Sequence, residues 1–263
     1  MLANARMYSV TPASTEAWRT VISWATQAAG VPVEFVAHAP PKLLSELWAR
    51  DDLGVVQMCG LPASLREPAP TILAAPLPSL PRYGGKAIYM SDLAVRADSK
   101  FQSIEDTFGG TAGYTLKDSQ SGYFAFRYYL QTKHPKAKYK KIVGGLMNAR
   151  GIVQALAKGE IDIGPLDGYV WDLIRAGDPA FAAQVRVIAS TDPTPMPPLV
   201  STGLGATEVD RLRAAFRRVH EEKSLEAARQ ALLIERFVVP KLSVYDETKN
   251  RASRVEWESE PWP

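Results

Sequence analysis

The chain has 263 residues, of which 46% are apolar and 22% charged, as is ordinary for a globular protein. A chain of this length can bury a sizeable core, in one large domain or in two of roughly 100–150 residues. The net charge of +3, without a long basic stripe, argues against nucleic acid as a partner, and no apolar run is long enough for a membrane span.

The residue types needed for metal binding or nucleophilic catalysis are missing or badly spaced. The single cysteine, Cys59, excludes an intrachain disulfide, and no cysteine or histidine spacing typical of a metal site occurs. The three histidines have no serine or cysteine motif beside them, and the phosphate-binding glycine motifs are absent. We therefore expect a protein that binds a ligand, uses no cofactor or metal, and is not an enzyme.

The first ten residues, MLANARMYSV, lack the charged and apolar segments of a secretory leader. Two interpretations follow: the protein is cytoplasmic, or this sequence starts at a mature boundary. A strand expected at residues 5–9 favours the second interpretation.

Strand and helix signals alternate through the first part of the chain. The β-rich runs lie at residues 5–9, 33–37, 53–60 and 71–77, and the helical patterns at 14–29 and 41–52. Gly30 is expected to end the first helix. This β-α-β-α-β order predicts a mostly parallel sheet flanked by helices.

A long extended run at residues 86–99 has no turn signal and can carry the chain into a second domain. Alternation then resumes, with strands expected at 111–115, 140–144, 161–167 and 185–190, and with helices after Ser103, Ser121, Asn148 and Asp167. The stiff proline segment 193–198 can carry the chain back, and residues 206–232 predict two helices. The tail from Thr248 is polar, with Trp257 and Trp262 available to dock.

These patterns predict an α/β protein with two Rossmann-like lobes joined by two crossing segments. Lobe 1 is expected to comprise residues 1–88 and 197–263, and lobe 2 residues 89–196. Such an architecture places a ligand cleft between its lobes.

The segment LKDSQSGYFAFRYYLQT, residues 116–132, sets small polar groups at the start of an aromatic helix. The first N–H groups of a helix lack backbone partners and carry partial positive charge, so they can bind an anion with Ser119 and Ser121. Gly122 would permit a close approach to the backbone. The alternative is that Ser119 or Ser121 only caps the helix.

Asp167 ends the strand expected at 161–167, at the same edge as this turn. Its carboxylate can bind a ligand ammonium or hydroxyl group. The alternative is a capping role for the helix that begins near Tyr169.

Several segments, in order over roughly residues 5–245, resemble the substrate-binding proteins of phosphate, phosphite and phosphonate ABC transporters. These proteins have the type II periplasmic binding protein fold. The matching segments are MYS at 7–9, QMCGLP at 57–62, YMSDLAVRADS at 89–99, DSQSGYFAFR at 118–127, GEIDIGPLD at 159–167 and PPLVST at 197–202.

The resemblance implies a periplasmic, monomeric protein that closes around a small anionic or zwitterionic solute and delivers it to a membrane permease. Ser119, Gln120 and Ser121 would hold the anionic group, and Asp167 the amine or hydroxyl end. The remaining residues implied to contact the ligand are Tyr8, Cys59, Gly60, Tyr89, Ser91 and Asn148.

The chain departs from the family pattern at three positions. Leu61 stands where relatives have tyrosine, Asn148 where many have histidine, and Gly151 where many have serine. The loss of a potential cation and a hydroxyl argues against a dianionic phosphonate, and leaves two expectations: a more weakly charged ligand or a ligand of a quite different kind.

Two other functions fit the same fold. One is a cytoplasmic enzyme, since this architecture also carries a thiamine-pyrimidine synthase and menaquinone-pathway enzymes. The synthase resemblance would require a cysteine-rich motif that this chain lacks. The other is a ligand-sensing module of a receptor, which would require a signalling partner.

Overall fold

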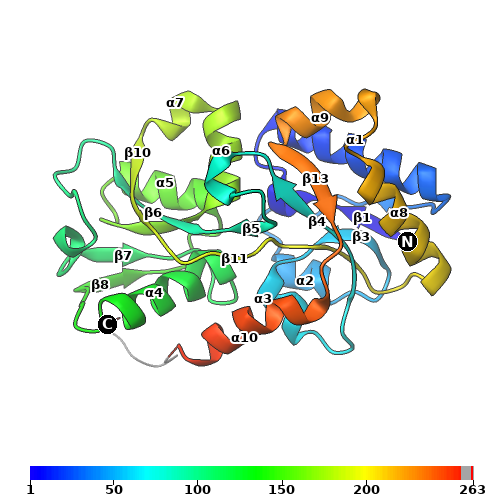
Figure 1. The fold of residues 1–263 in the computed structure, drawn as a ribbon. Helices are drawn as coiled ribbons and strands as arrows, with labels where there is room; N and C mark the ends of the chain where they lie inside the picture. The colour runs from blue at the N-terminus through cyan, green and yellow to red at the C-terminus, as the bar shows by residue number, and fades with distance from the viewer. Residues whose placement is uncertain (256–261, 263) are drawn as a thin grey trace. The chain divides into compact units, whose positions relative to one another are not determined.

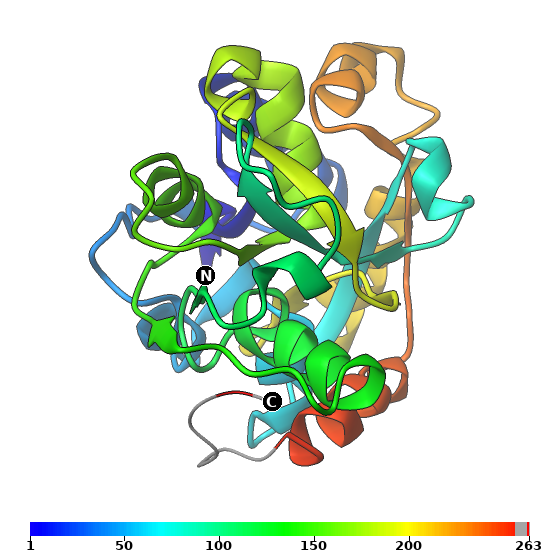
Figure 2. The same cartoon turned by 90° about the vertical axis from the view of Figure 1, so that its left-hand side faces the viewer.

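The computed structural model describes residues 1–255 and 262 and contains two compact units (Figures 1 and 2). Unit 1 comprises Met1–Ile88 and Pro195–Asp246, and unit 2 comprises Tyr89–Thr194 and Glu247–Pro263. Two short strands, β5 (Ile88–Tyr89) and β11 (Thr194–Pro195), pair where the chain passes from one unit to the other.

Unit 1 is built on a six-stranded sheet with the order β13-β4-β12-β3-β1-β2. Strands β3 and β4 consist almost entirely of apolar residues and are buried almost throughout. The strands are β1 (Leu2–Asn4), β2 (Glu34–Phe35), β3 (Leu53–Gln57), β4 (Thr71–Pro78), β12 (Leu199–Ser201) and β13 (Ile234–Val238).

The strands from the first part of the chain run in one direction, as expected for a mostly parallel sheet. Strand β1 is parallel to β2 and β3, and β4 has the same direction as β3 because β12 pairs antiparallel with both. The antiparallel members are β12, which enters the sheet from the returning proline segment rather than through a helical crossover, and β13, which pairs with β4. The structure differs from the prediction at residues 6–8, which form a 3-10 turn and not part of a strand.

The helices of unit 1 follow from local signals. In α1 (Pro12–Ala29), Thr11 and Ser14 form a reciprocal cap, and Gly30 ends the helix in the left-handed conformation at φ 61°. Helix α1 packs against α8 (Ala206–Arg218) and α9 (Glu226–Ala231), and α3 (Gly60–Leu65) packs against the 3-10 turn Leu242–Tyr245. The remaining helix is α2 (Leu44–Trp48).

Unit 2 contains a three-stranded antiparallel sheet, β10-β6-β9, and a parallel pair, β7 with β8. Its strands are β6 (Ser91–Arg96), β7 (Thr111–Gly113), β8 (Lys141–Val143), β9 (Gly164–Asp167) and β10 (Val185–Ser190). Its helices are α4 (Ala125–Lys133), α5 (Ala149–Ala157), α6 (Gly168–Gly177) and α7 (Pro179–Ala182). Helix α5 packs on β9 and β6 through the buried Ile152, Val153 and Leu156.

The assignment of residues 197–263 to lobe 1 is wrong for the last part of the chain. Helix α10 (Asp246–Ser253) falls almost wholly in unit 2, where Arg251 donates to the Pro193 carbonyl at 3.1 Å and lies over the Tyr128 ring. Trp262 is 1% exposed and packs against the rings of Tyr114 and Tyr123. Trp257, the other tryptophan expected to dock, lies outside the described residues.

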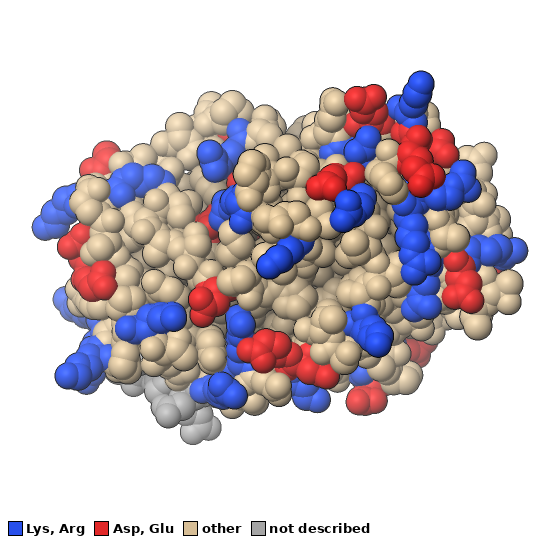
Figure 3. Space-filling view, viewed as in Figure 1, with Lys and Arg blue, Asp and Glu red and all other residues tan. Residues whose placement is uncertain are grey.

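Basic and acidic side chains are interspersed over the face shown in Figure 3. That distribution agrees with the small net charge. Among the residues described, no helix has the length and apolar character that a membrane span requires.

The docking of Trp262 predicts that the substitution Trp262→Ala destabilises unit 2. Removing a buried tryptophan from an aromatic cluster costs about 3–5 kcal/mol of the free energy of unfolding. Urea unfolding followed by circular dichroism measures the loss. Arg254→Ala, at an exposed position nearby, is the control and should change this free energy by less than about 0.5 kcal/mol. Equal stability of Trp262→Ala and the unsubstituted protein would contradict the docking.

Candidate functional site

The predicted polar residues of unit 2 meet at one edge of its three-stranded sheet. Because β6 and β9 are antiparallel, Ser91 at the start of β6 pairs in register with Asp167 at the end of β9. The turn before α4 joins them, since the Ser91 hydroxyl donates to the Ser121 carbonyl at 2.9 Å. The Ser121 hydroxyl in turn hydrogen-bonds the Asp167 carboxylate. Ser91, Ser121 and Asp167 therefore form one hydrogen-bonded group.

The turn itself is a π-helical segment, Gln120–Phe124, that continues into α4. Ser119 is its cap, because its hydroxyl accepts the Gly122 N–H at 3.0 Å. Gly122 is required for packing, because a Cβ atom there would overlap the Thr115 hydroxyl. Gly122 is therefore needed for the backbone conformation of the turn. The N–H groups of Gln120 and Ser121 come before the capped Gly122 N–H at the helix start.

Gln120 is 2% exposed, and its side-chain oxygen has no hydrogen-bond partner among the described residues. A buried amide oxygen without a donor costs about 1–3 kcal/mol. Natural proteins keep such groups mainly where a ligand or an ordered water supplies the partner. Gln120 therefore fits a ligand that carries a hydrogen-bond donor.

Asp167 caps α6, as the alternative interpretation of this residue predicted. Its carboxylate accepts the N–H groups of Tyr169 and Val170, each at 3.0 Å. Burial nevertheless raises the pKa of the Asp167 carboxyl to about 7, against the opposing effect of these N–H groups and the Ser121 hydroxyl. The nearby Asp92 carboxylate also raises this pKa.

Three residues at the same edge are absent from the predicted set. Asp92 is fully buried and accepts a hydrogen bond of 2.6 Å from the Ser190 hydroxyl, and the Thr191 hydroxyl accepts the Ser91 N–H at 3.0 Å. A signal was available in the sequence, because Asp92 is a charged residue inside the otherwise uncharged run YMSDLAV. Tyr89, at the start of unit 2, is 1% exposed and lies in β5, outside the pairing of β6 with β9.

Asn148 and Gly151 belong to a different helix start. The Asn148 side chain is exposed and accepts the Gly151 N–H at 3.1 Å, which makes it the cap of α5. A Cβ atom on Gly151 would overlap the Leu146 backbone carbonyl, so the serine of relatives does not fit this loop. The loss of that hydroxyl thus follows from the backbone of the Leu146–Asn148 turn.

In unit 1, the predicted residues are buried and held by their neighbours. Tyr8 is fully buried, stacks on Trp18 with ring centroids 6.4 Å apart, and donates its backbone N–H to the Gln57 side-chain oxygen at 3.2 Å. Cys59 precedes α3 in the apolar core, and a Cβ atom on Gly60 would lie 2.8 Å from the Tyr245 ring. Gly60 is therefore required by packing, and Gln57 is the polar side chain that was not predicted.

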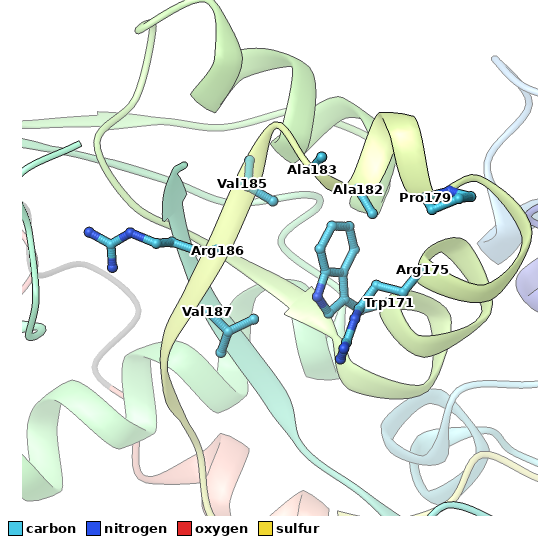
Figure 4. Close-up of a pocket in the computed structure, with 8 residues that line it drawn as sticks. All are labelled: Trp171, Arg175, Pro179, Ala182, Ala183, Val185, Arg186 and Val187. Carbon is cyan, nitrogen blue, oxygen red and sulfur yellow. The ribbon is translucent and has the colours of Figure 1, made fainter. Parts of the chain in front are cut away.

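Figure 4 shows a surface hollow of about 440 Å³ in unit 2, formed by α6, α7 and β10 around Trp171. It contains none of the predicted ligand residues. The Arg186 guanidinium at its side donates to the backbone carbonyls of Ala97 and Ser99. Within residues 1–255 and 262, no group of three or more metal-ligating side chains occurs either. The sheet edge with Ser91, Ser121 and Asp167 is accordingly the candidate site.

The sequence matches, over residues 8–245, a family model described as the periplasmic substrate-binding protein of phosphonate ABC transporters. The chain belongs to this family. Its members bind small-molecule ligands, work with membrane permeases and are not enzymes. A comparison with curated proteins finds no significant match.

Similarity to solved structures shows that this chain has the type II periplasmic binding protein fold, as the phosphonate-binding proteins do. A binding component of a phosphonate ABC transporter from Pseudomonas aeruginosa aligns with a TM-score of 0.77 and 19% identity, over 94% of this chain and 85% of its own. PhnD1 from Prochlorococcus marinus, solved with methylphosphonate, aligns with a TM-score of 0.75 and 16% identity, over 92% of this chain and 93% of its own. A Xanthomonas citri protein bound to ATP aligns with a TM-score of 0.66 and 18% identity, over 96% of each chain.

The capping role of Ser119 predicts that Ser119→Ala loses about 1 kcal/mol of the free energy of unfolding, because the Gly122 N–H loses its acceptor. Ser119→Asn keeps an acceptor at the cap and should retain most of the stability. Urea unfolding of both variants measures the difference. If the alanine and asparagine variants are equally stable, the side chain is not a cap.

The raised pKa of Asp167 predicts a pH-dependent stability in the ligand-free protein. From pH 4 to 7 the folded protein retains a proton on Asp167 that the unfolded chain releases, since the ordinary pKa is 3.8. The contribution of Asp167 to the free energy of unfolding therefore falls as pH rises through this window and is constant above it. Asp167→Asn keeps the cap but removes the proton equilibrium.

The measurement is urea unfolding of both proteins at pH values from 4 to 8. The stability of Asp167→Asn relative to the unsubstituted protein should rise between pH 4 and 7 and then level off. Other titrating groups cancel in this difference. A difference that does not vary with pH would show that Asp167 has an ordinary pKa.

Proposed function

We propose that this protein binds a small phosphonate-type anion that also carries a hydrogen-bond donor, and presents it to the permease of an ABC transporter. The observation that supports the proposal is the group formed by the buried Gln120 and the partly exposed Ser121 and Asp167 beside the start of the π-helical turn. Helix-start N–H groups and hydroxyls suit anionic oxygens. The Gln120 oxygen and the Asp167 carboxylate suit an ammonium or hydroxyl group.

The proposal also covers location and assembly. Membership of a family of periplasmic binding proteins supports a periplasmic site of action. We further propose that the protein acts as a monomer, since one chain supplies every residue of the candidate site. The complex of the Prochlorococcus marinus protein with methylphosphonate supports the choice of ligand class.

Isothermal titration calorimetry tests the ligand class with methylphosphonate, 2-aminoethylphosphonate, phosphate and sulfate. We expect 2-aminoethylphosphonate to bind at least tenfold more tightly than methylphosphonate, because its ammonium group gives Asp167 and Gln120 a donor. Native mass spectrometry of freshly purified protein provides a second test, since a tightly bound ligand is retained. The absence of binding to both phosphonates would overturn the proposal.

Ser121→Ala should weaken binding of the preferred phosphonate by about tenfold, as expected for the loss of one hydrogen bond to a charged group. Thr132→Ala removes an exposed hydroxyl from the same helix and is the matched control, with unchanged binding. Equal binding by the Ser121→Ala variant and the control would remove Ser121 from the site.

A further inference from the structure

The turn that carries Ser121 has an uncommon backbone. It is π-helical, with the Phe124 N–H donating to the Ser119 carbonyl, five residues earlier, at 3.1 Å. Such segments are rare, occur mostly as single turns inside α-helices, and are frequent at functional sites. A hydrogen bond from the Thr115 N–H to the Gly122 carbonyl, also at 3.1 Å, fastens the turn to the segment that follows β7.

Trp262 packs against the residues next to that hydrogen bond. Tyr114 comes directly before Thr115, and the residue directly after Gly122 is Tyr123. The Trp262 indole stacks on the Tyr114 ring with centroids 5.6 Å apart, and lies edge-to-face with the Tyr123 ring at 5.5 Å. The two tyrosine rings also contact each other, at 4.9 Å. The three rings thus hold the segment after β7 against the π-helical turn.

A buried cation joins the same rings to helix α4. Arg127 is fully buried, and its guanidinium donates to the Tyr123 hydroxyl at 2.7 Å. The guanidinium also lies over the Tyr123 and Trp262 rings, at 5.4 and 5.3 Å from their centroids. The face of an aromatic ring attracts a cation, and more strongly where water is excluded. Loss of the Trp262 ring would therefore remove one of the faces that stabilise Arg127, and with it part of the support of Tyr123.

We propose that Trp262 is a positioning residue of the candidate site, and that its docking favours the conformation of the π-helical turn that binds the ligand. Trp262 acts through Tyr123, which lies in the turn two residues after Ser121. Coupling of this kind is reciprocal, so a ligand bound at the turn also favours the docked position of Trp262. All of these residues belong to unit 2. The inference rests on the proposed function, since the turn is where the ligand is proposed to bind.

Isothermal titration calorimetry of folded variants tests the coupling, with the phosphonate that the unsubstituted protein binds best. Trp262→Ala should raise the dissociation constant about tenfold, within the range typical of coupled sites. Trp262→Phe keeps an aromatic ring against Tyr114 and Tyr123 and should restore the affinity to within about twofold. Leu156→Ala is the matched control, because it removes a buried side chain from α5 of the same unit. Its binding should stay within about twofold, since a loss of stability alone does not change the affinity of folded molecules.

A spectroscopic measurement on the unsubstituted protein does not depend on the folding of Trp262→Ala. The six tryptophans are replaced by 5-fluorotryptophan, and Trp262→Phe identifies the ¹⁹F signal of Trp262. Because the coupling is reciprocal, addition of the phosphonate should shift this signal. An unshifted signal at saturating ligand would overturn the inference, as would a folded Trp262→Ala variant with unchanged affinity. Equal weakening by Leu156→Ala would also overturn it, because the effect would then follow the stability of unit 2 and not the aromatic contacts.

The two proposals fail in distinguishable ways. If the unsubstituted protein binds neither phosphonate, the proposed function is wrong, and the role assigned to Trp262 is wrong with it. If the unsubstituted protein binds a phosphonate and Trp262→Ala binds it equally, only the role of Trp262 is wrong. A Trp262 signal that shifts on ligand addition, together with weak binding by Trp262→Ala and restored binding by Trp262→Phe, supports both.

Discussion

The hydrogen bond from the Ser91 hydroxyl to the Ser121 carbonyl is the interaction on which the candidate site depends. It ties the turn before α4 to the end of the unit 2 sheet where the register of β6 and β9 sets Ser91 opposite Asp167. A shift of that register by one residue would turn Ser91 to the opposite face of the sheet. The Ser121 hydroxyl would then lose its place beside Asp167. The helix start, the carboxylate and the buried Gln120 are thus held together by the pairing of two strands that are distant in sequence.

Among the residues that the structure describes, each unit buries one glutamine with an amide end that has no hydrogen-bond partner, and the two ends are of opposite kind. In unit 1 the orientation of Gln57 leaves a donor, whereas in unit 2 the Gln120 oxygen is an acceptor. A neutral amide can discriminate between ligands without a fixed charge, because the penalty falls on the polar group that is left without a partner.

Local signals in the sequence predicted the elements that are stabilised locally. Gly30 ends α1, Asn148 caps α5, and the polar turn at 119–121 precedes an aromatic helix, because capping and periodicity depend on neighbouring residues. The antiparallel entry of β12, the strand β13 and the placement of α10 in unit 2 depend on contacts between distant segments, and short apolar runs do not specify their partners. The site shows the same division. The turn and Asp167 were accessible as motifs, whereas the hydrogen bond from Ser91 to Ser121 joins distant segments.

In the proposed function, Asp167 would determine which charge state of the ligand the turn accepts. With its pKa raised to about 7, the carboxyl is close to half protonated at neutral pH. The protonated form donates to an anionic oxygen and adds no negative charge beside the helix start. The ionised form accepts from an ammonium group but repels a second negative charge on the ligand. The nearby Asp92 also weakens the case for a dianion. A zwitterion, whose ammonium pairs with the ionised carboxylate while its anionic end meets the N–H groups of the turn, is the ligand that this electrostatic arrangement favours.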